Sequence, residues 1–294
     1  MAVAPVLLLD TFSLFFRAHY ALPWMSTRAG EPTSALYGFS ALLLKLLREQ
    51  RGASLAFALD APQPTFRHDA FEAYKAGRAP TPTSLSAQFG RLHQLLEALA
   101  VPVFRCPGFE ADDVLATLAA HARAQAEPAL VVSGDRDLLQ LAHGSVRVHF
   151  VGRRGKDAVV YDEAAVLARF GVPPVNLPSY VALAGDASDN LPSVPGIGGA
   201  TAGKLLAGKA NCEQLFADLT AVKSARLRET LLAHRAQILH SETLARLRDD
   251  APLPEAGPRW AVPSPSALRA LGTVFQELEF KTLLGRLETL IGHA

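Results

Sequence analysis

Short aliphatic runs alternate with longer stretches of helical periodicity in the first half of the chain. The runs PVLLLD, SLAFALD, VPVFRC, PALVVSGD and VRVHFV, which lie between residues 5 and 151, are typical of buried strands. Residues 34–50, 84–100 and 112–125 carry apolar side chains at i, i+3, i+4 and i+7, which predicts amphipathic helices. This alternation predicts an α/β fold in which helices flank a mostly parallel central sheet.

The pattern changes near residue 160 and becomes almost wholly helical. Proline- and glycine-rich breaks interrupt it at GVPPVNLP and LPSVPGIGG. We therefore expect an α/β core in residues 1–160 and a helical region in residues 161–294. Residues 61–84 form one long polar interruption, which exceeds the length of an ordinary loop between a strand and a helix.

The composition is that of a folded protein, with 49% hydrophobic and 19% charged residues. The two cysteines, Cys106 and Cys212, lie far apart, which argues against a disulfide framework and favours a reducing, cytoplasmic location. No apolar run approaches the roughly 18 residues of a membrane span, and the apolar start lacks the basic region of a signal peptide. A cytoplasmic protein without a membrane partner is expected.

Acidic residues gather where the predicted strands end. Asp10, Asp60 and Asp135 each follow a strand, and the carboxyl ends of parallel strands form the usual ligand crevice. A single aspartate there is more often a turn or helix-capping residue, so the inference depends on its acidic neighbours. Those neighbours are Glu110, Asp112 and Asp113 at a helix start, Asp137 beside Asp135, and Asp186 and Asp189 before a glycine-rich turn.

Nine carboxylates that share one region repel each other unless positive charge lies among them. Mg²⁺ and Mn²⁺ prefer such oxygen ligands, and nine carboxylates are too many for one ion. Two hard ions about 4 Å apart can activate water and neutralise a phosphate during phosphodiester hydrolysis. No GxSxG or HExxH motif competes for the chemistry, and GGATAGKL lacks the Ser or Thr of a P-loop because Leu205 occupies that position.

The net charge of +1 conceals basic residues that remain once the acidic cluster is set apart. Nine of the 28 acidic residues belong to the cluster, which leaves 19 against 29 basic residues and allows a positive face for a polyanion. In the long interruption, Lys75 and Arg78 would share a face if the segment is helical. Tyr74 could stack on a base there, and Arg67 adds a further positive charge. An ordinary solvated loop is the alternative.

Residues 191–206 read as a glycine hairpin that leads into a helix. Small residues such as Gly196 and Gly198 allow a phosphate to approach the free N–H groups of the helix. A plain turn between two helices is the alternative for the same sequence.

In combination these motifs resemble the 5′-nuclease (flap endonuclease) family, most closely the N-terminal 5′→3′ exonuclease domain of bacterial DNA polymerase I. The similarity runs from LLLDTFSLFFRAHYAL through YKAGRAPTP, FEADDVLATLA and SGDRDLLQL to LAGDASDNLPSVPGIG, and covers nearly the whole chain. It implies a PIN-like nuclease core, a helical arch at about residues 61–84, and a helix–hairpin–helix at about residues 186–206 that grips duplex DNA, with a K⁺ ion.

The resemblance also implies roles for individual residues. Lys75 and Arg78 would contact the scissile phosphate. DNA contacts would fall on Arg17, Tyr74, Gly196, Gly198 and Lys204. The ligands of two Mg²⁺ ions, which Mn²⁺ can replace, would be Asp10, Asp60, Glu110, Asp112, Asp113, Asp135, Asp137, Asp186 and Asp189. Gly199 and Ala200 stand where family members often carry Glu-Lys, so the expected duplex contact is weaker or moved to Lys204.

We therefore expect a divalent-metal-dependent 5′→3′ exonuclease or 5′-flap endonuclease that acts on DNA as a monomer, with RNA–DNA hybrids as further candidate substrates. No polymerase or proofreading segment follows the matched part, which predicts a free-standing nuclease. Two alternatives stay open. One is a protein that binds branched nucleic acid with little cleavage, and the other is a metal-dependent phosphatase for small substrates, which would need neither an arch nor a hairpin.

Overall fold

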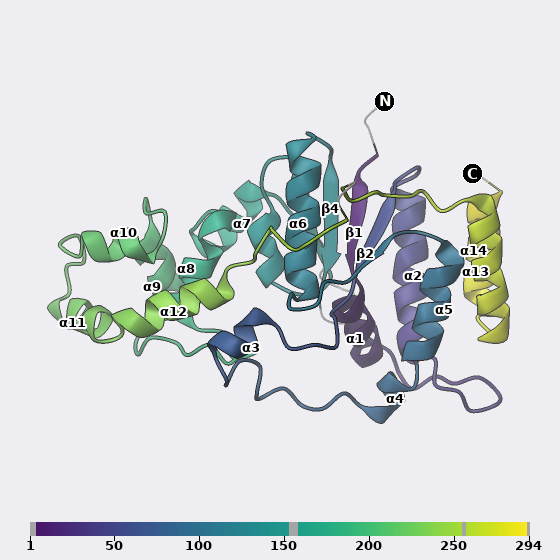
Figure 1. Ribbon diagram of the computed structural model, residues 1–294, viewed down its shortest axis with the longest axis horizontal. Helices are drawn as coiled ribbons and strands as arrows, with labels where there is room; N and C mark the ends of the chain where they lie inside the picture. Colours follow the sequence, from purple (N-terminus) through teal and green to yellow (C-terminus); the bar gives the residue numbers. More distant parts are fainter. Residues whose placement is uncertain (1–3, 153–157, 255–256, 293–294) are drawn as a thin grey trace.

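A six-stranded sheet with the order β3-β2-β1-β4-β5-β6 forms the centre of the protein in the computed structural model, which describes residues 4–152, 158–254 and 257–292 (Figure 1). The first five strands in the chain run parallel, and β6 is antiparallel to β5. The strands are β1 (Val6–Asp10), β2 (Leu55–Ala58), β3 (Val103–Phe104), β4 (Ala129–Ser133), β5 (Val146–Phe150) and β6 (Val159–Tyr161). The predicted α/β fold and its five strands are confirmed, whereas β6 was not predicted.

Helices cover both faces of the sheet, which explains why its strands read as continuous apolar runs. Leu8 of β1 enters the core that α6 (Ala111–Ala124) helps to form, and Leu9 enters the core on the opposite face. The helices on that second face include α1 (Thr11–Ala21), α2 (Ser34–Glu49) and α5 (Phe89–Leu99). The helix predicted over residues 84–100 is divided, because α4 (Thr83–Ser86) ends before α5 begins.

A helical region extends away from the sheet on the left of Figure 1. One 3₁₀ helix, η1 (Asp137–Leu141), lies between β4 and β5 along the chain, and another, η3 (Pro174–Asn176), lies within the helical region. The helices of the region are α7 (Glu163–Phe170), α8 (Leu177–Ala184), α9 (Gly199–Leu206), α10 (Cys212–Ala217), α11 (Ala225–Ala233) and α12 (Arg235–Ala245). Within the described ranges, no helix has the length and apolar character needed to cross a membrane.

The last two helices return to the sheet. Helices α13 (Pro265–Glu277) and α14 (Lys281–Ile291) contact α5 and α2, and side chains such as Leu271 and Phe275 belong to the second core (Figure 1). Residues 265–291 were predicted within the helical region, but they pack with the α/β part. The division at residue 160 itself stays a prediction.

The arch segment, residues 61–84, contains little helix. Helix α3 (Phe66–Ala70) is followed by turns and by an extended chain that runs below the other elements of Figure 1 to α4. Lys75 has a φ of 57°, so the helix considered for Lys75 and Arg78 is not formed. Pro80 and Pro82 explain the extended chain, because proline disfavours helical conformation in the residue before it.

A hairpin joins α8 to α9, as the sequence predicted. The backbones of Asp186 and Leu191 exchange two hydrogen bonds of 3.0 and 2.8 Å. Gly196 then turns the chain with a φ of 77°, a conformation that favours glycine, and α9 begins directly after Gly198.

Candidate active site

The ends of the parallel strands bring four carboxylates to one cleft. Strand β1 ends at Asp10, which also caps α1 by accepting a hydrogen bond from the Ser13 amide. Asp60 and Asp135 follow β2 and β4, and Asp112 lies in the first turn of α6. All four line a cleft of about 910 Å³. The structure therefore assembles the acidic crevice that the positions of the aspartates predicted.

The acids of this cleft are unfavourably crowded when no cation accompanies them. Burial raises the pKa of Asp10 to about 7, the Ser133 hydroxyl opposes this by donating to the carboxylate, and the charges of Asp60 and Asp135 raise the pKa again. Burial followed by the Asp135 charge also raises the pKa values of Asp112 and Asp137 well above their ordinary range. Such shifts show that these groups resist carrying negative charge together.

Asp137, Asp186 and Asp189 extend the acidic region beyond the cleft lining. Asp137 opens η1, its amide donates to Asp135 over 3.0 Å, and the charges of Asp135, Asp189 and Asp186 raise its pKa after burial. Asp186 and Asp189 come from the hairpin between α8 and α9. The helical region thus supplies the acids furthest along the chain.

Three residues of the arch segment contact two of the predicted ligands. Lys75 Nζ lies 2.7 Å from Glu110 Oε1, and Arg78 Nη2 lies 2.9 Å from Asp189 Oδ1. The Tyr74 hydroxyl is 3.0 Å from Glu110 Oε2 and 2.9 Å from Asp189 Oδ2. Lys75 and Arg78 also line the cleft, where the sequence predicted them to meet a phosphate.

The prediction that Tyr74 stacks on a nucleic-acid base is contradicted in this conformation. Tyr74 is only 3% exposed, and its ring meets the His68 ring edge-on. Its hydroxyl bridges two carboxylates, so the residue acts as an interior link between the arch segment and the acids.

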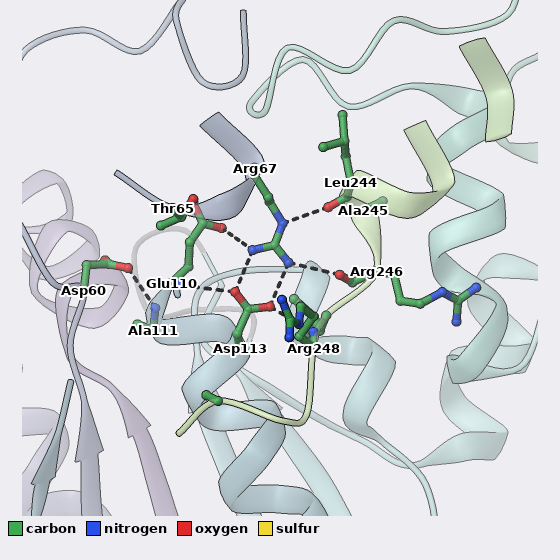
Figure 2. Close-up of polar contacts among 12 residues, drawn as sticks. Asp60, Thr65, Arg67, Glu110, Ala111, Asp113, Leu244, Ala245, Arg246 and Arg248 are labelled. Atoms are coloured by element: carbon green, nitrogen blue, oxygen red, sulfur yellow. Dashed lines mark hydrogen bonds and ion pairs between the residues drawn. The ribbon is translucent and has the colours of Figure 1, made fainter. Parts of the chain in front are cut away.

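Asp113 does not face the cleft, and its predicted role as a metal ligand is wrong for this structure. It is 0% exposed, and its two oxygens accept four hydrogen bonds (Figure 2). Arg67 donates two, over 2.6 and 2.8 Å, and the amides of Glu110 and Arg248 donate the others, over 3.1 and 2.9 Å. A carboxylate has about four acceptor positions, so none is left for an ion.

The other acids suit hard cations by their chemistry. They offer only oxygen atoms, the ligands that Mg²⁺ and Mn²⁺ prefer, and a cation would offset the burial and the like charges that raise the pKa values of Asp10, Asp112 and Asp137. Among the residues that the structure describes, no three acidic, His or Cys side chains are already grouped as metal ligands. Glu110 and Asp189 are instead paired with Lys75 and Arg78 of the arch segment.

The predicted DNA-contact residues lie in two places. Arg17 of α1 lines the cleft, donates to the Gly134 carbonyl and lies 5.5 Å from the centre of the Phe150 ring. Gly196, Gly198 and the exposed Lys204 belong to the hairpin and α9, and they do not line the cleft. They form a separate surface, and their contacts with DNA stay a prediction.

Tyr180 explains why glycine occupies position 199. A Cβ atom on Gly199 would collide with the Tyr180 hydroxyl, so the glutamate that family members often carry there would require the Tyr180 side chain to move. The departure noted in the sequence is therefore accommodated by a neighbouring side chain on α8.

Aromatic side chains form a wall of the cleft that sequence analysis missed. Phe12, Phe16 and Tyr20 line it from α1, and Phe89 lines it from α5. The three residues of α1 are spaced four apart, which places them on one helical face. That spacing is the signal that could have identified them.

The comparisons with known proteins agree with this arrangement. A family profile described as the 5′-3′ exonuclease N-terminal resolvase-like domain matches residues 5–171, and one described as the 5′-3′ exonuclease C-terminal SAM fold matches residues 172–266. DNA polymerase I of Bacillus caldotenax is 39% identical over 284 residues, which are 97% of this chain and 32% of that protein. Thermostable DNA polymerase I of Thermus filiformis is 41% identical over 281 residues, 95% of this chain and 32% of the relative. The chain thus spans about a third of the length of these relatives.

Solved structures share the fold over nearly the whole chain. A bacteriophage T5 flap endonuclease in a complex with DNA and metal ions has a TM-score of 0.66 at 17% identity, covering 98% of this chain and 99% of that one. The catalytic core of Rad2 in complex with DNA substrate has a TM-score of 0.61 at 16% identity, covering 98% and 92%. The resemblance inferred from the sequence is confirmed: the chain belongs to the 5′-3′ exonuclease family, whose members are hydrolases that act on DNA.

Proposed function

We propose that the chain is a structure-selective nuclease that uses two Mg²⁺ ions, replaceable by Mn²⁺, to hydrolyse phosphodiester bonds at 5′ ends and 5′-flap junctions of DNA. The observation that carries the proposal is the composition of one cleft. Acids that need a cation, the cations Lys75 and Arg78, and an aromatic wall meet there. These are the groups that would hold metal ions, a phosphate and a base. A phosphatase for small substrates would not need the aromatic wall.

The acids divide between two proposed ion positions. Asp10, Asp60, Glu110 and Asp112 would hold one ion, and Asp135, Asp137, Asp186 and Asp189 would hold the other. Bound ions of this kind lower the pKa of a coordinated water and stabilise charge on the attacking and leaving oxygens. Asp113 is left out of both sets.

Lys75 and Arg78 would bind the scissile phosphate. Their present partners, Glu110 and Asp189, are proposed metal ligands, so ion binding releases both cations towards the cleft that they line. Their charge would orient the phosphate and offset the negative charge that develops on its oxygens.

Other surfaces would hold the remainder of the substrate. The ring of Tyr20, which is 68% exposed, offers a base a stacking face at the cleft. The hairpin of Gly196 and Gly198, with Lys204 on α9, would bind duplex phosphates, and a K⁺ ion is proposed at the same hairpin. RNA–DNA hybrids are proposed as further substrates, a monomer as the acting form, and the cytoplasm as the location.

A cleavage assay on a labelled 5′-flap duplex tests the proposal. Wild type, an Asp135→Ala/Asp137→Ala variant and a control Glu97→Ala/Glu288→Ala variant, altered at two exposed acids of α5 and α14, would each be assayed in Mg²⁺ and in EDTA. We expect cutting near the junction by wild type and control in Mg²⁺ only, and at least a 1,000-fold slower rate for the Asp135/Asp137 variant. Tight binding without cleavage in Mg²⁺ and in Mn²⁺ would instead identify a protein that binds branched DNA.

A further inference from the structure

We infer that Arg67 and Asp113 are a buried positioning pair that fixes Glu110 and the base of the arch segment as one unit, and that neither residue contacts a metal ion or DNA. The inference rests on the proposed function, because it assigns the parts of that metal site. Asp113 differs from the other acids of the predicted ligand set because its two oxygens accept four hydrogen bonds from protein donors.

Arg67 is as fully engaged as its partner. It is 1% exposed, and a guanidinium has five N–H donors. Nε donates to the Leu244 carbonyl over 2.8 Å, and Nη2 donates to the Arg246 carbonyl over 3.0 Å in addition to Asp113. Nη1 donates to Asp113 and, over 3.2 Å, to Glu110 Oε2. Five contacts therefore occupy the whole donor set, and Arg67 keeps no donor for a phosphate.

The contacts of the pair join three parts of the chain that lie far apart in the sequence. Arg67 belongs to α3 in the arch segment, Asp113 to the first turn of α6, and the carbonyls of Leu244 and Arg246 to the end of α12 (Figure 2). The amide of Arg248 adds a further bond to Asp113 from the chain that leaves α12. The pair thus fastens the arch segment and the helical region to the start of α6.

Glu110 is held by the pair at two points. Its backbone amide donates to Asp113 Oδ2, and its carboxylate accepts from Arg67. Glu110 in turn contacts Tyr74 and Lys75 of the arch segment. The orientation of one proposed ligand, and of the arch residues beside it, is therefore set by a pair that does not line the cleft.

A buried ion pair is better suited to fixing the orientation of its neighbours than to stabilising the fold. Removing the two charges from water is costly, and apolar replacements are often as stable as the pair. A bidentate Arg–carboxylate contact, however, fixes both planes and both directions. Residues that orient the ligands of a metal typically change metal affinity or activity 10- to 100-fold when they are altered. Because such residues are not ligands themselves, we expect the number of ions bound to stay the same.

The number of Mn²⁺ ions bound per chain separates positioning from ligation, and it can be counted by electron paramagnetic resonance of the free ion. Wild type is compared with Arg67→Gln/Asp113→Asn, which removes both charges but keeps polar groups for the backbone, and with Asp137→Asn, a proposed ligand. We expect two ions for wild type, two ions with roughly 10-fold weaker affinity for the double variant, and one ion for Asp137→Asn. Flap cleavage by the double variant should lose kcat about 10- to 100-fold with little change in KM, and high Mn²⁺ should restore part of it.

Loss of one ion in the double variant, as in Asp137→Asn, would overturn the inference. Wild type that binds no ion would refute the proposed function instead.

Thermal unfolding checks that each variant folds. If the double variant does not fold, Arg67→Lys replaces it in the test. This variant keeps the buried positive charge and loses only the bidentate contact with Asp113. We expect two ions, a lower kcat and an unchanged salt dependence of DNA binding for Arg67→Lys. The positioning role would be overturned if Arg67→Lys kept the kcat and ion affinity of the wild type, or if its DNA binding depended less on salt.

Discussion

The Asp10 carboxylate is the clearest example of a residue whose environment favours the protonated form. Its pKa rises from 3.8 to about 7 in the folded, ion-free protein. The folded state therefore holds a proton that the unfolded state loses between those values. The resulting stabilisation is full below about pH 4 and is lost as the pH rises through about 7.

Asp10→Asn should consequently stabilise the ion-free protein at neutral pH and above. We expect about 2 kcal/mol in the free energy of unfolding at pH 8 in EDTA, and little gain near pH 3, where most of the wild-type aspartate is protonated in both states. Urea unfolding at both pH values measures the difference. Adding Mg²⁺ at pH 8 should stabilise wild type more than the variant, and an equal effect on both would argue against Asp10 as a ligand.

Gly199 is a position where a side chain on another helix, that of Tyr180, favours a small residue. Gly199→Ala should lower the free energy of unfolding by about 1–3 kcal/mol, because the added Cβ collides with the Tyr180 hydroxyl. Gly198→Ala is the matched control, since a Cβ there would meet no atom within 4 Å. Thermal unfolding of the two variants compares them, and equal melting temperatures would show that the contact with Tyr180 is not tight.

At the scale of elements, helix α1 presents an aromatic face to the cleft. Tyr20→Ala should weaken binding of a flap substrate by about 1–3 kcal/mol, the range of base stacking, while Tyr20→Phe, which keeps the ring, should bind as wild type does. Fluorescence anisotropy in Ca²⁺, without cleavage, would measure both dissociation constants. Equal losses for the two variants would point to the hydroxyl group and not to stacking.

The arch segment should loosen when an ion enters the site. Lys75 and Arg78 now hold it to Glu110 and Asp189, and an ion would take those carboxylates away. Hydrogen exchange of residues 72–82 should therefore speed up when Ca²⁺ is added, whereas α13, which lies in the other core, should not change. Slower exchange in residues 72–82 would mean that ions order the segment directly.

The sequence predicted elements well where one physical rule dominated. The strands were recognisable because both faces of the sheet are covered, and the acids because they follow the carboxyl ends of those strands. The helix considered for Lys75 and Arg78 does not form, because Lys75 adopts a turn conformation and two prolines follow it. Asp113 could not be separated from Asp112, since neighbours on a helix point about 100° apart and only packing decides which one faces the cleft.

At the scale of the whole molecule, the acidic region in and beside the cleft depends on segments from both halves of the chain. Strand ends and α6 supply the first acids, the hairpin after α8 supplies the last, and the arch segment lies between them. Helices α13 and α14 could not be assigned to the α/β part from periodicity, because an amphipathic pattern does not reveal its partner surface.

The central claim is that two ions in this cleft drive hydrolysis of DNA at a 5′ end or junction. The most direct measurement is the single-turnover rate of 5′-flap cleavage as a function of Mg²⁺ concentration. The rate should rise with about the square of the Mg²⁺ concentration before it saturates, as expected when two ions are needed. A flap that binds tightly but is not cut at any concentration of Mg²⁺ or Mn²⁺ would contradict the claim.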